Sequence, residues 1–238
     1  MFASSASVNR EADSAYRQTL KQAQAKERLN PHPEQLERVR GVANRLIAAT
    51  GAFRLDAPGW RWEVNVLSGK DVNAWCMPGG KIAVYTGLLD KVQPTDDELA
   101  AVIGHEIAHA LREHGREKAG QAMGINLAAA IGGAILGSRL GLDPSLGQNV
   151  LGTVGDLAFM RPNSREMEQE ADRIGVELAA RAGYDPHAAI SLWEKMRRVS
   201  ESEPPQWLST HPSHEMRIGD LKVNADRVEP LYRPGSAR

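Results

Sequence analysis

The sequence predicts an α+β domain that is mainly helical and carries one small antiparallel sheet of three strands. Long segments place apolar residues at the three- and four-residue spacing of helices, whereas one region, 60–86, alternates polar and apolar residues as strands do. Hydrophobic residues make up 42% and charged residues 25% of the 238 positions, which is ordinary for a globular protein. The formal net charge of -1 leaves no basic footprint, so we expect no nucleic-acid partner.

The chain is expected to divide into three parts. These are an N-terminal helical arm or tether at 1–30, one domain at 31–228 and a C-terminal tail at 229–238. Residues 8–29 are rich in helix-favouring Ala, Gln, Lys, Glu and Arg, and Asn30–Pro33 breaks that helix. The first residues lack the basic and apolar regions of a secretory signal, so we expect any signal or lipid anchor to lie outside this chain.

The predicted sheet follows a second helix, which is expected at 34–50. Three strands are predicted at 60–67, 73–77 and 81–86. Short turns separate them, so we expect an antiparallel meander in which each strand pairs with the next. The edge of such a sheet can pair with an extended peptide, because its free backbone groups supply the hydrogen bonds. Cys76 is the one cysteine, so it forms no intrachain disulfide and fits a small buried hydrophobe.

A helix predicted at 96–114 carries the motif with the clearest chemistry. Thr95 and Glu98 have the spacing of a capping box, which predicts where this helix begins. The stretch His105–His109 reads H-E-x-x-H, and histidines four apart lie on one helix face, about 6 Å along the axis, so both can bind one metal ion. Glu106 lies beside them, where it can take the proton of a water held by that metal.

A surface helix with a chance His-Glu-His pattern is the alternative explanation of this motif. The flanking residues, however, are strongly apolar. They are Leu99, Ala101, Val102, Ile103, Ile107, Ala108, Ala110 and Leu111. A helix this apolar is buried, and buried histidines and glutamates need polar or metal partners, so the pattern favours a metal site.

A further metal ligand is expected on a later helix, predicted at 165–182 and capped by Ser164. A catalytic zinc usually has three protein ligands and keeps one position for water. Glu168 and Asp172 lie four residues apart on one face, so Glu168 can bind zinc while Asp172 hydrogen-bonds a histidine ligand. A solvated acidic face explains the same spacing equally well. Its members would be Glu166, Glu168, Glu170 and Asp172.

The remaining segments have simpler expected roles. His114 lies five residues beyond His109 and therefore points to another part of the helix surface, so we expect it to be exposed or capping. The longest uncharged stretch, Gln121–Ser138, is rich in Gly and Ala and fits a buried or interface helix better than a membrane span. Further helices are expected at 145–160, at 186–198 and after the segment Thr210–Ile218.

Four of these segments together resemble the M48 (Ste24-type) zinc metallopeptidase family. They are Asn73–Lys81, His105–His109, Ser164–Gly175 and Thr210–Ile218, and the resemblance covers about Pro33 to Ala225 in order. Within the family, the chain resembles the soluble bacterial outer-membrane-associated members of the LoiP and BepA type. The resemblance implies a zincin-like metalloprotease domain that binds one Zn2+ per chain.

The resemblance also implies which residues hold the metal. Glu168 is the implied third ligand beside His105 and His109. Asp172 is implied to support the ligand set from behind. The spacing alone leaves open whether Glu168 binds zinc or belongs to a solvated acidic face, and only the resemblance favours the ligand.

Three catalytic residues are implied in the same way. Glu106 is the implied base. His211 either caps the metal in a resting state or steadies the oxyanion of the transition state, with His214 as the local competitor for that role. Arg217 holds the carboxylates or the oxyanion. The implied substrate-binding strand consists of Gly80, Lys81, Ile82, Ala83, Val84 and Tyr85.

The resulting hypothesis is a zinc-dependent endopeptidase in cell-envelope protein quality control. Zinc lowers the pKa of its water toward ~7, and Glu106 takes the proton and passes it to the leaving amine. Expected partners are unfolded or misassembled polypeptide substrates and outer-membrane or membrane proteins, in a periplasmic, outer-membrane-associated location. Two alternatives stay open: a zinc-bound chaperone or binding module with an autoinhibited, rarely cleaving site, and a purely structural helical protein without zinc.

Overall fold

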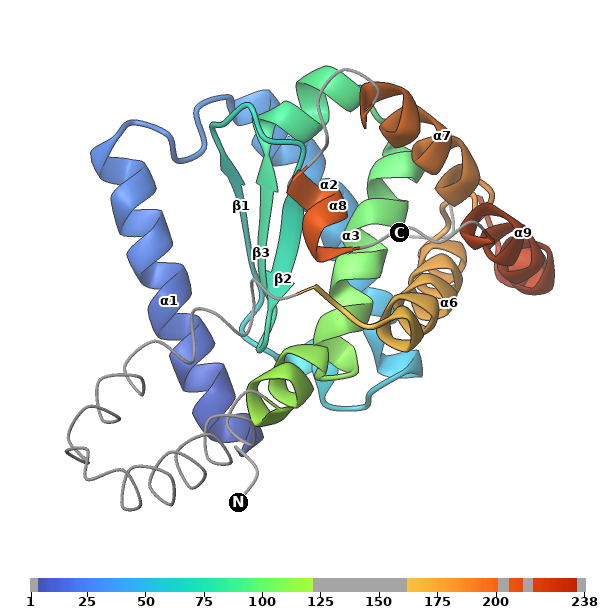
Figure 1. Ribbon diagram of the computed structural model, residues 1–238, viewed down its shortest axis with the longest axis horizontal. Coiled ribbons are helices and arrows are strands. Elements are labelled where there is room, and N and C mark those ends of the chain that lie inside the picture. The colour runs from blue at the N-terminus through green and yellow to red at the C-terminus, as the bar shows by residue number, and fades with distance from the viewer. Residues whose placement is uncertain (1–3, 122–161, 201–205, 212–215, 235–238) are drawn as a thin grey trace, which may run out of the picture.

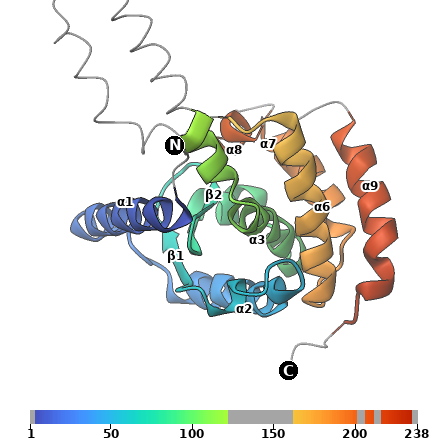
Figure 2. The same cartoon turned by 90° about the horizontal axis from the view of Figure 1, so that it is seen from below.

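The architecture is a set of helices packed around one small sheet, with a long helix, α3, at its centre. The computed structural model describes residues 4–121, 162–200, 206–211 and 216–234. In the described residues, α1 covers the outer side of the sheet, α3 lies on the other side, and α6 and α9 follow as further layers (Figures 1 and 2). This agrees with the predicted mainly helical α+β class.

The helices have the positions that the sequence patterns predict, within a few residues. Their apolar stripes face the interior, and caps of the expected kind begin α3 and α6. The elements are α1 (Ser5–Ala25), α2 (Pro33–Ala49), β1 (Glu63–Leu67), β2 (Ala74–Met77), β3 (Lys81–Tyr85), the short π-helix η3 (Leu88–Val92), α3 (Asp96–Leu111), α6 (Arg165–Arg181), α7 (Ala188–Ser200), α8 (Gln206–Thr210) and α9 (Arg217–Val228).

The sheet is mixed, so the prediction of an antiparallel meander is wrong. Its strand order is β1-β3-β2, with β1 parallel and β2 antiparallel to β3. β3 pairs with a strand on each side, and its side chains Ile82, Ala83 and Val84 are all fully buried, which is typical of a central strand. Alternation along the chain predicts where strands lie, but does not predict which of them occupies the middle.

This strand order also corrects the predicted substrate edge. Every residue of the strand Lys81–Tyr85 pairs with β1, and Lys81–Val84 pair with β2 on the other side. The backbone of β3 therefore has no free edge to offer an extended peptide. β2 is the edge strand on the side that contacts α3, and its residues Trp75, Cys76 and Met77 are partly exposed.

The predicted N-terminal arm is a regular helix that packs on the sheet. Tyr16 of α1 is fully buried and its hydroxyl donates to the backbone oxygen of Ile82 at 3.1 Å. The side-chain amide of Asn65 in β1 donates to the same hydroxyl at 2.9 Å. Burial raises the pKa of Tyr16 to about 12, so this hydroxyl stays protonated. The arm is thus anchored to two strands through one tyrosine.

α3 and α6 approach so closely that two glycines are required at their contact. A Cβ placed on Gly175 of α6 would lie 2.8 Å from the backbone nitrogen of His105, and one on Gly104 would lie 3.0 Å from the backbone oxygen of Gly175. The first distance is shorter than real Cβ contacts and the second is tighter than most of them, and the obstructing atoms belong to backbone. The glycines therefore allow the two helices that carry the metal-binding candidates to touch.

Replacing Gly175 with alanine is expected to destabilise the fold and to weaken metal binding. Overpacking costs about 1–3 kcal/mol, and it would move Glu168 of α6 away from His105 of α3. Thermal unfolding with and without zinc measures both effects. Gly41→Ala is the matched control, because nothing lies within 4 Å of a Cβ at that helical position. Equal unfolding temperatures for the two variants would contradict the close approach.

Two predicted segments lie outside the described residues. They are the Gly/Ala-rich stretch Gln121–Ser138, apart from its first residue, and the helix expected at 145–160. Among the residues that the structure describes, no helix is both long and apolar enough to cross a membrane.

Candidate metal centre

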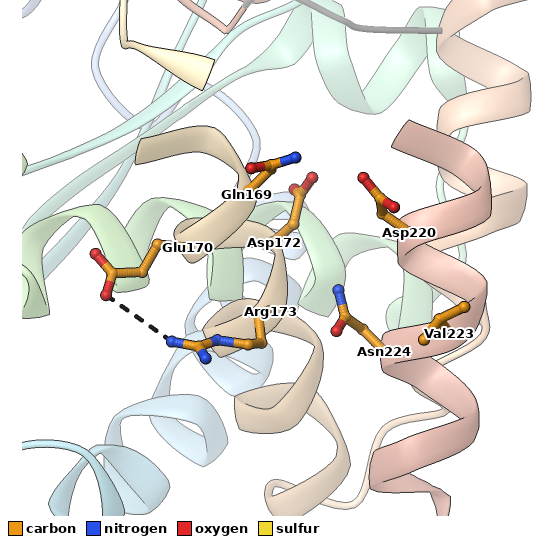
Figure 3. A pocket seen from close by; sticks show the side chains of 7 residues that line it. All are labelled: Gln169, Glu170, Asp172, Arg173, Asp220, Val223 and Asn224. Atoms are coloured by element: carbon orange, nitrogen blue, oxygen red, sulfur yellow. Dashed lines mark ion pairs between the residues drawn. The ribbon is translucent and has the colours of Figure 1, made fainter. Parts of the chain in front are cut away.

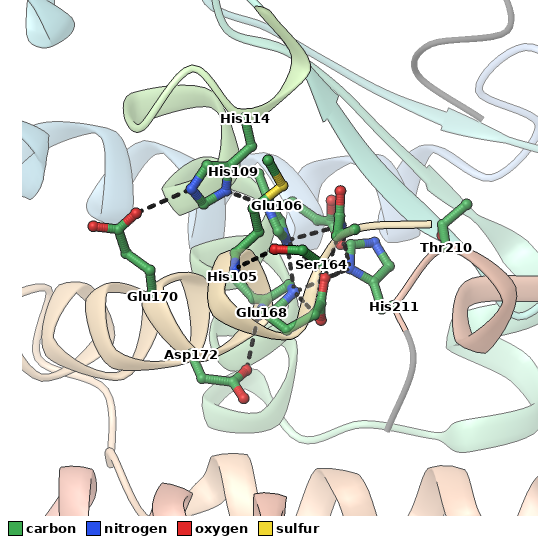
Figure 4. A network of polar contacts seen from close by, with 12 residues as sticks. His105, Glu106, His109, His114, Ser164, Glu168, Glu170, Asp172, Thr210 and His211 are labelled. Carbon is green, nitrogen blue, oxygen red and sulfur yellow. Dashed lines mark hydrogen bonds and ion pairs between the residues drawn. The ribbon is translucent and has the colours of Figure 1, made fainter. Parts of the chain in front are cut away.

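Three segments distant in the sequence bring four potential ligands together. His105 and His109 lie one turn apart on α3, Glu168 comes from the first half of α6, and His211 follows α8 (Figure 4). One ligand atom from each of the four lies within 4.8 Å of all the others, and all four residues are buried. The structure thus joins the residues that the sequence analysis could place only one helix at a time.

The distances between these atoms suit a tetrahedral metal site. Ligand atoms about 2.0 Å from a zinc ion lie about 3.3 Å from one another. Nε2 of His105 lies 3.0 Å from Nε2 of His109 and 3.5 Å from Oε2 of Glu168. Nδ1 of His211 lies 3.2 Å from Nε2 of His105 and 2.9 Å from Oε1 of Glu168. The donor set of nitrogens and one carboxylate is the one that zinc prefers, so the residues fit this ion.

Burial and charge oppose each other within the cluster. Burial by itself lowers the pKa of His105, but Glu168 and Asp172 raise that pKa to about 9. For His109 burial prevails and its pKa falls well below the usual value. Burial would raise the pKa of Glu168, yet the imidazoles of His105, His109 and His211 hold it below its usual value. The carboxylate is therefore ionised and His109 neutral, as metal binding requires, whereas His105 must release its proton when a metal binds.

Asp172 and Arg217 support the cluster from behind. Oδ1 of Asp172 accepts a hydrogen bond from Nδ1 of His105 at 2.9 Å, which leaves Nε2 of His105 facing the other ligands. The guanidinium of Arg217 donates to Glu168 at 2.9 Å and to Asp172 at 2.7 Å. It also stacks over Trp193, 4.0 Å from the ring centroid. Asp172 thus contacts His105, and Arg217 contacts both Glu168 and Asp172.

Glu106 is buried on α3 beside the potential ligands and contacts Trp207 and His211. Its Oε1 accepts a hydrogen bond from the indole nitrogen of Trp207 at 2.7 Å and lies 3.3 Å from Nε2 of His211. The Trp207 ring stacks on the His211 ring with centroids 4.7 Å apart. Glu106 is therefore linked to His105 and Glu168 through His211, and Trp207 of α8 packs against its carboxylate.

Sequence reasoning missed three residues of this site. Trp207 is 1% exposed and holds Glu106, as described above. The Asn163 amide donates to Oε1 of Glu168 at 2.7 Å, and its oxygen accepts from Lys118 at 2.7 Å. No spacing pattern relates either residue to the metal motif.

His114 is the third: it was expected to be exposed or capping, but it is buried. It is 3% exposed, and its Nδ1 lies 2.8 Å from Nδ1 of His109. The helical spacing misled because the helix ends first: Glu113 adopts a left-handed backbone conformation with φ 58°. This turn at Glu113 brings the imidazole of His114 back into contact with that of His109.

A separate hollow lies on the far side of α6. It has a volume of about 380 Å³ and opens between α6 and α9 (Figure 3). None of the four potential ligands lines it. Its walls are Gln169, Glu170, Asp172, Arg173, Asp220, Val223 and Asn224. This hollow is therefore behind the ligand helix rather than on the side of Glu106 and β2.

A helix bearing H-E-x-x-H, a glutamate from a second helix and an adjacent sheet edge together define a zinc metallopeptidase site. Peptidase family M48 matches residues 33–225, and the chain belongs to this family. The predicted resemblance is thereby confirmed.

Individual relatives come from both mitochondria and bacteria. The chain is 39% identical to mitochondrial metalloendopeptidase OMA1 of Bos taurus over 74% of its own length, and spans 34% of that protein. It is 32% identical to metalloprotease LoiP of Escherichia coli, with 79% of the chain and 73% of the relative covered. The β-barrel assembly-enhancing protease of Escherichia coli is 29% identical, with 70% and 35% covered. The chain thus spans about a third of several of its relatives.

Proposed function

We propose that this protein is a zinc-dependent endopeptidase whose ligands are His105, His109 and Glu168. The observation that carries the proposal is the buried meeting of these three donors, with the carboxylate of Glu106 on the same helix and 3.3 Å from His211. A solvated acidic face on α6 would leave Glu168 exposed, whereas it is fully buried. A purely structural helical protein would gain nothing from four buried donors that converge on one point.

The chain's own residues supply the acid–base chemistry of peptide hydrolysis. Zinc, when bound, acts as a Lewis acid that activates water and polarises the substrate carbonyl. Glu106 accepts the proton of the attacking water and delivers it to the leaving amine. His211, whose Nε2 faces Glu106, stabilises the negative charge that develops on the carbonyl oxygen. Arg217 keeps Glu168 ionised and in place through its direct hydrogen bond.

The substrate is proposed to pair with β2. This strand is the edge of the sheet that contacts α3. Burial raises the pKa of the Cys76 thiol, and the nearby charge of Glu106 raises it further. An extended peptide along Ala74–Met77 therefore places a scissile carbonyl close to Glu106. Backbone pairing of this kind recognises unfolded segments rather than one side-chain sequence.

A closed resting state is the second candidate, and one observation favours it. His211 supplies a fourth donor to the metal cluster, while α8 places Trp207 against Glu106. Trp207 also donates its backbone N–H to the oxygen of Val72 at 3.2 Å, just ahead of β2. A protein kept in this state would act as a zinc-bound chaperone or binding module that rarely cleaves. Movement of α8 and His211 would convert it to the active form.

Cell-envelope protein quality control is the proposed setting. Two relatives from Escherichia coli support it, and one of them is named for enhancing β-barrel assembly. The proposed substrates are unfolded or misassembled polypeptides, the proposed partners are outer-membrane or membrane proteins, and the proposed location is the periplasm at the outer membrane. The mitochondrial relatives are named as metalloendopeptidases too, so the peptidase proposal does not depend on this setting.

Metal removal is expected to abolish cleavage of an unfolded protein by this chain. The test incubates the chain with reduced, unfolded casein, with and without a chelator, and follows both fragments and suppression of aggregation. Chelation should stop fragment formation, and stoichiometric zinc should restore it. Suppressed aggregation without fragments, even at high enzyme concentration, would favour the chaperone. Zinc-independent cleavage would overturn the proposal.

A further inference from the structure

A chain of polar contacts runs from the potential ligand His109 to the surface. Nδ1 of His109 lies 2.8 Å from Nδ1 of His114, and Nε2 of His114 lies 3.0 Å from Oε2 of Glu170. The other carboxylate oxygen of Glu170 accepts from Nε of Arg112 at 2.9 Å. Figure 4 shows His114 between the other imidazole and the carboxylate. The peptidase chemistry above does not use His114, Glu170 or Arg112.

One arrangement of protons satisfies all of these contacts. Nε2 of His109 faces the metal cluster, 3.0 Å from Nε2 of His105, so it must be free to bind and the proton resides on Nδ1. That N–H donates to Nδ1 of His114. The proton of His114 is then on Nε2, where the carboxylate of Glu170 accepts it. Each group donates toward the surface, and the negative charge at the end is held by Arg112.

The backbone is bent to allow this contact. In a continued helix, His114 would lie about 140° around the axis from His109. The left-handed φ of 58° at Glu113 breaks the helix instead. Such a conformation is uncommon for a residue other than glycine, and it persists only where the surroundings enforce it. Here the Glu113 carboxylate is held by Arg116 at 2.7 Å and by Arg54 at 3.4 Å.

The same construction occurs behind the other histidine. Nδ1 of His105 donates directly to Asp172, which is held by Arg217 at 2.7 Å. Glu170 and Asp172 are two residues apart on α6, so one helix supplies the carboxylates behind both histidines. The difference is that His114 lies between His109 and Glu170, whereas His105 contacts Asp172 directly.

We propose that His114, backed by Glu170, is a positioning residue that fixes the ring orientation and tautomer of His109 for zinc. This inference rests on the proposed role of His109 as a ligand. A carboxylate or imidazole behind a ligand histidine makes that ligand more basic and removes its freedom to rotate. Loss of such a partner typically weakens metal affinity 10–100-fold.

The test measures zinc affinity rather than activity. Variants are made in the full chain carrying Glu106→Gln, to prevent self-cleavage, and zinc dissociation constants come from competition with a chromogenic chelator. His114→Ala should weaken zinc binding about 10–100-fold. His114→Gln should recover most of this loss, because a glutamine amide can accept from His109 and donate to Glu170. Glu170→Ala should weaken binding in the same direction but less.

His187→Ala is the matched control. It removes an imidazole that contacts a carboxylate, Asp226, at 2.9 Å but lies away from the metal cluster. Its zinc dissociation constant should stay within twofold of the parent. If His114 only packed in the core, His114→Ala would lower the unfolding temperature of the metal-free protein without changing its zinc affinity.

Each result decides a different claim. A His114→Ala dissociation constant within twofold of the parent overturns the inference while leaving the peptidase proposal intact. If that variant does not fold, Glu170→Ala decides, since its side chain is 27% exposed and tolerates truncation. An unchanged zinc affinity in Glu170→Ala then overturns the inference. A parent chain that binds no zinc overturns the proposed function instead.

Discussion

Replacing Glu106 with glutamine is expected to abolish cleavage while zinc stays bound. Glutamine has nearly the same shape and can still accept a hydrogen bond from Trp207, which donates to Oε1 of Glu106 at 2.7 Å. It cannot accept a proton from water or hold one for the leaving amine. General acid–base catalysis typically contributes about 10²–10⁴-fold, so the turnover number should fall by that factor.

The measurement pairs fragment release from unfolded casein with metal content after dialysis. Glu34→Gln is the matched control, because its side chain is 74% exposed on α2, far from the cluster in sequence and fold. Glu34→Gln should retain full activity and full zinc. Cleavage at the parental rate by Glu106→Gln would eliminate Glu106 as the base. Loss of zinc from the same variant would show that the residue serves the metal rather than the water.

Replacing Arg217 with leucine is expected to be strongly destabilising. Arg217 is 1% exposed, and its guanidinium forms ion pairs with two buried carboxylates, Glu168 and Asp172. Removing one partner of a buried ion pair leaves an uncompensated charge, which typically costs 3–5 kcal/mol. The loss should be largest in the metal-free protein, because zinc compensates part of the charge of Glu168 when it is bound.

Urea unfolding of the metal-free and zinc-loaded proteins checks this expectation. Arg227→Leu is the comparison on the same helix, since that side chain donates to Asn224 at 2.7 Å at an exposed position. Zinc should raise the stability of Arg217→Leu by more than it raises that of the parent. A stability within 1 kcal/mol of the parent in both states would mean that Arg217 does not hold the carboxylates.

Local patterns in the sequence were sufficient to predict α3, the helix that carries the H-E-x-x-H motif. The capping box of Thr95 and Glu98 is present, and α3 begins at Asp96 as expected. His105 and His109 share one face, as their spacing requires. These features depend on residues within four positions of one another, so the chain itself carries the information.

The same kind of reasoning could not decide the role of Glu168. Its spacing with Asp172 suited a ligand helix and a solvated acidic face equally. The decision comes from Gly104 and Gly175, which let α3 and α6 touch and bury Glu168 against both histidines. A contact between helices is not encoded in the periodicity of either one.

The sheet and His114 were predicted wrongly for a related reason. β3 hydrogen-bonds to β1 on one side and to β2 on the other, and its apolar side chains are buried, so β2 is the sheet edge that contacts α3. His114 turns back to His109 because Glu113 leaves the helical conformation. The strand order depends on the packing of the whole sheet, and the position of His114 depends on one backbone torsion. Neither can be read from alternation or from helical spacing.

By itself, the sequence determined the class of fold, the helix that carries the two histidines and the base between them. Only the tertiary structure decided that Glu168 and His211 meet those histidines, that Trp207 holds the base and that β2 is the sheet edge beside α3. The nitrogens of His105 and His211 lie 3.2 Å apart although the residues are 106 positions apart in the chain. Spacing along a helix is set by backbone geometry, whereas such a meeting is set by the packing of the whole core.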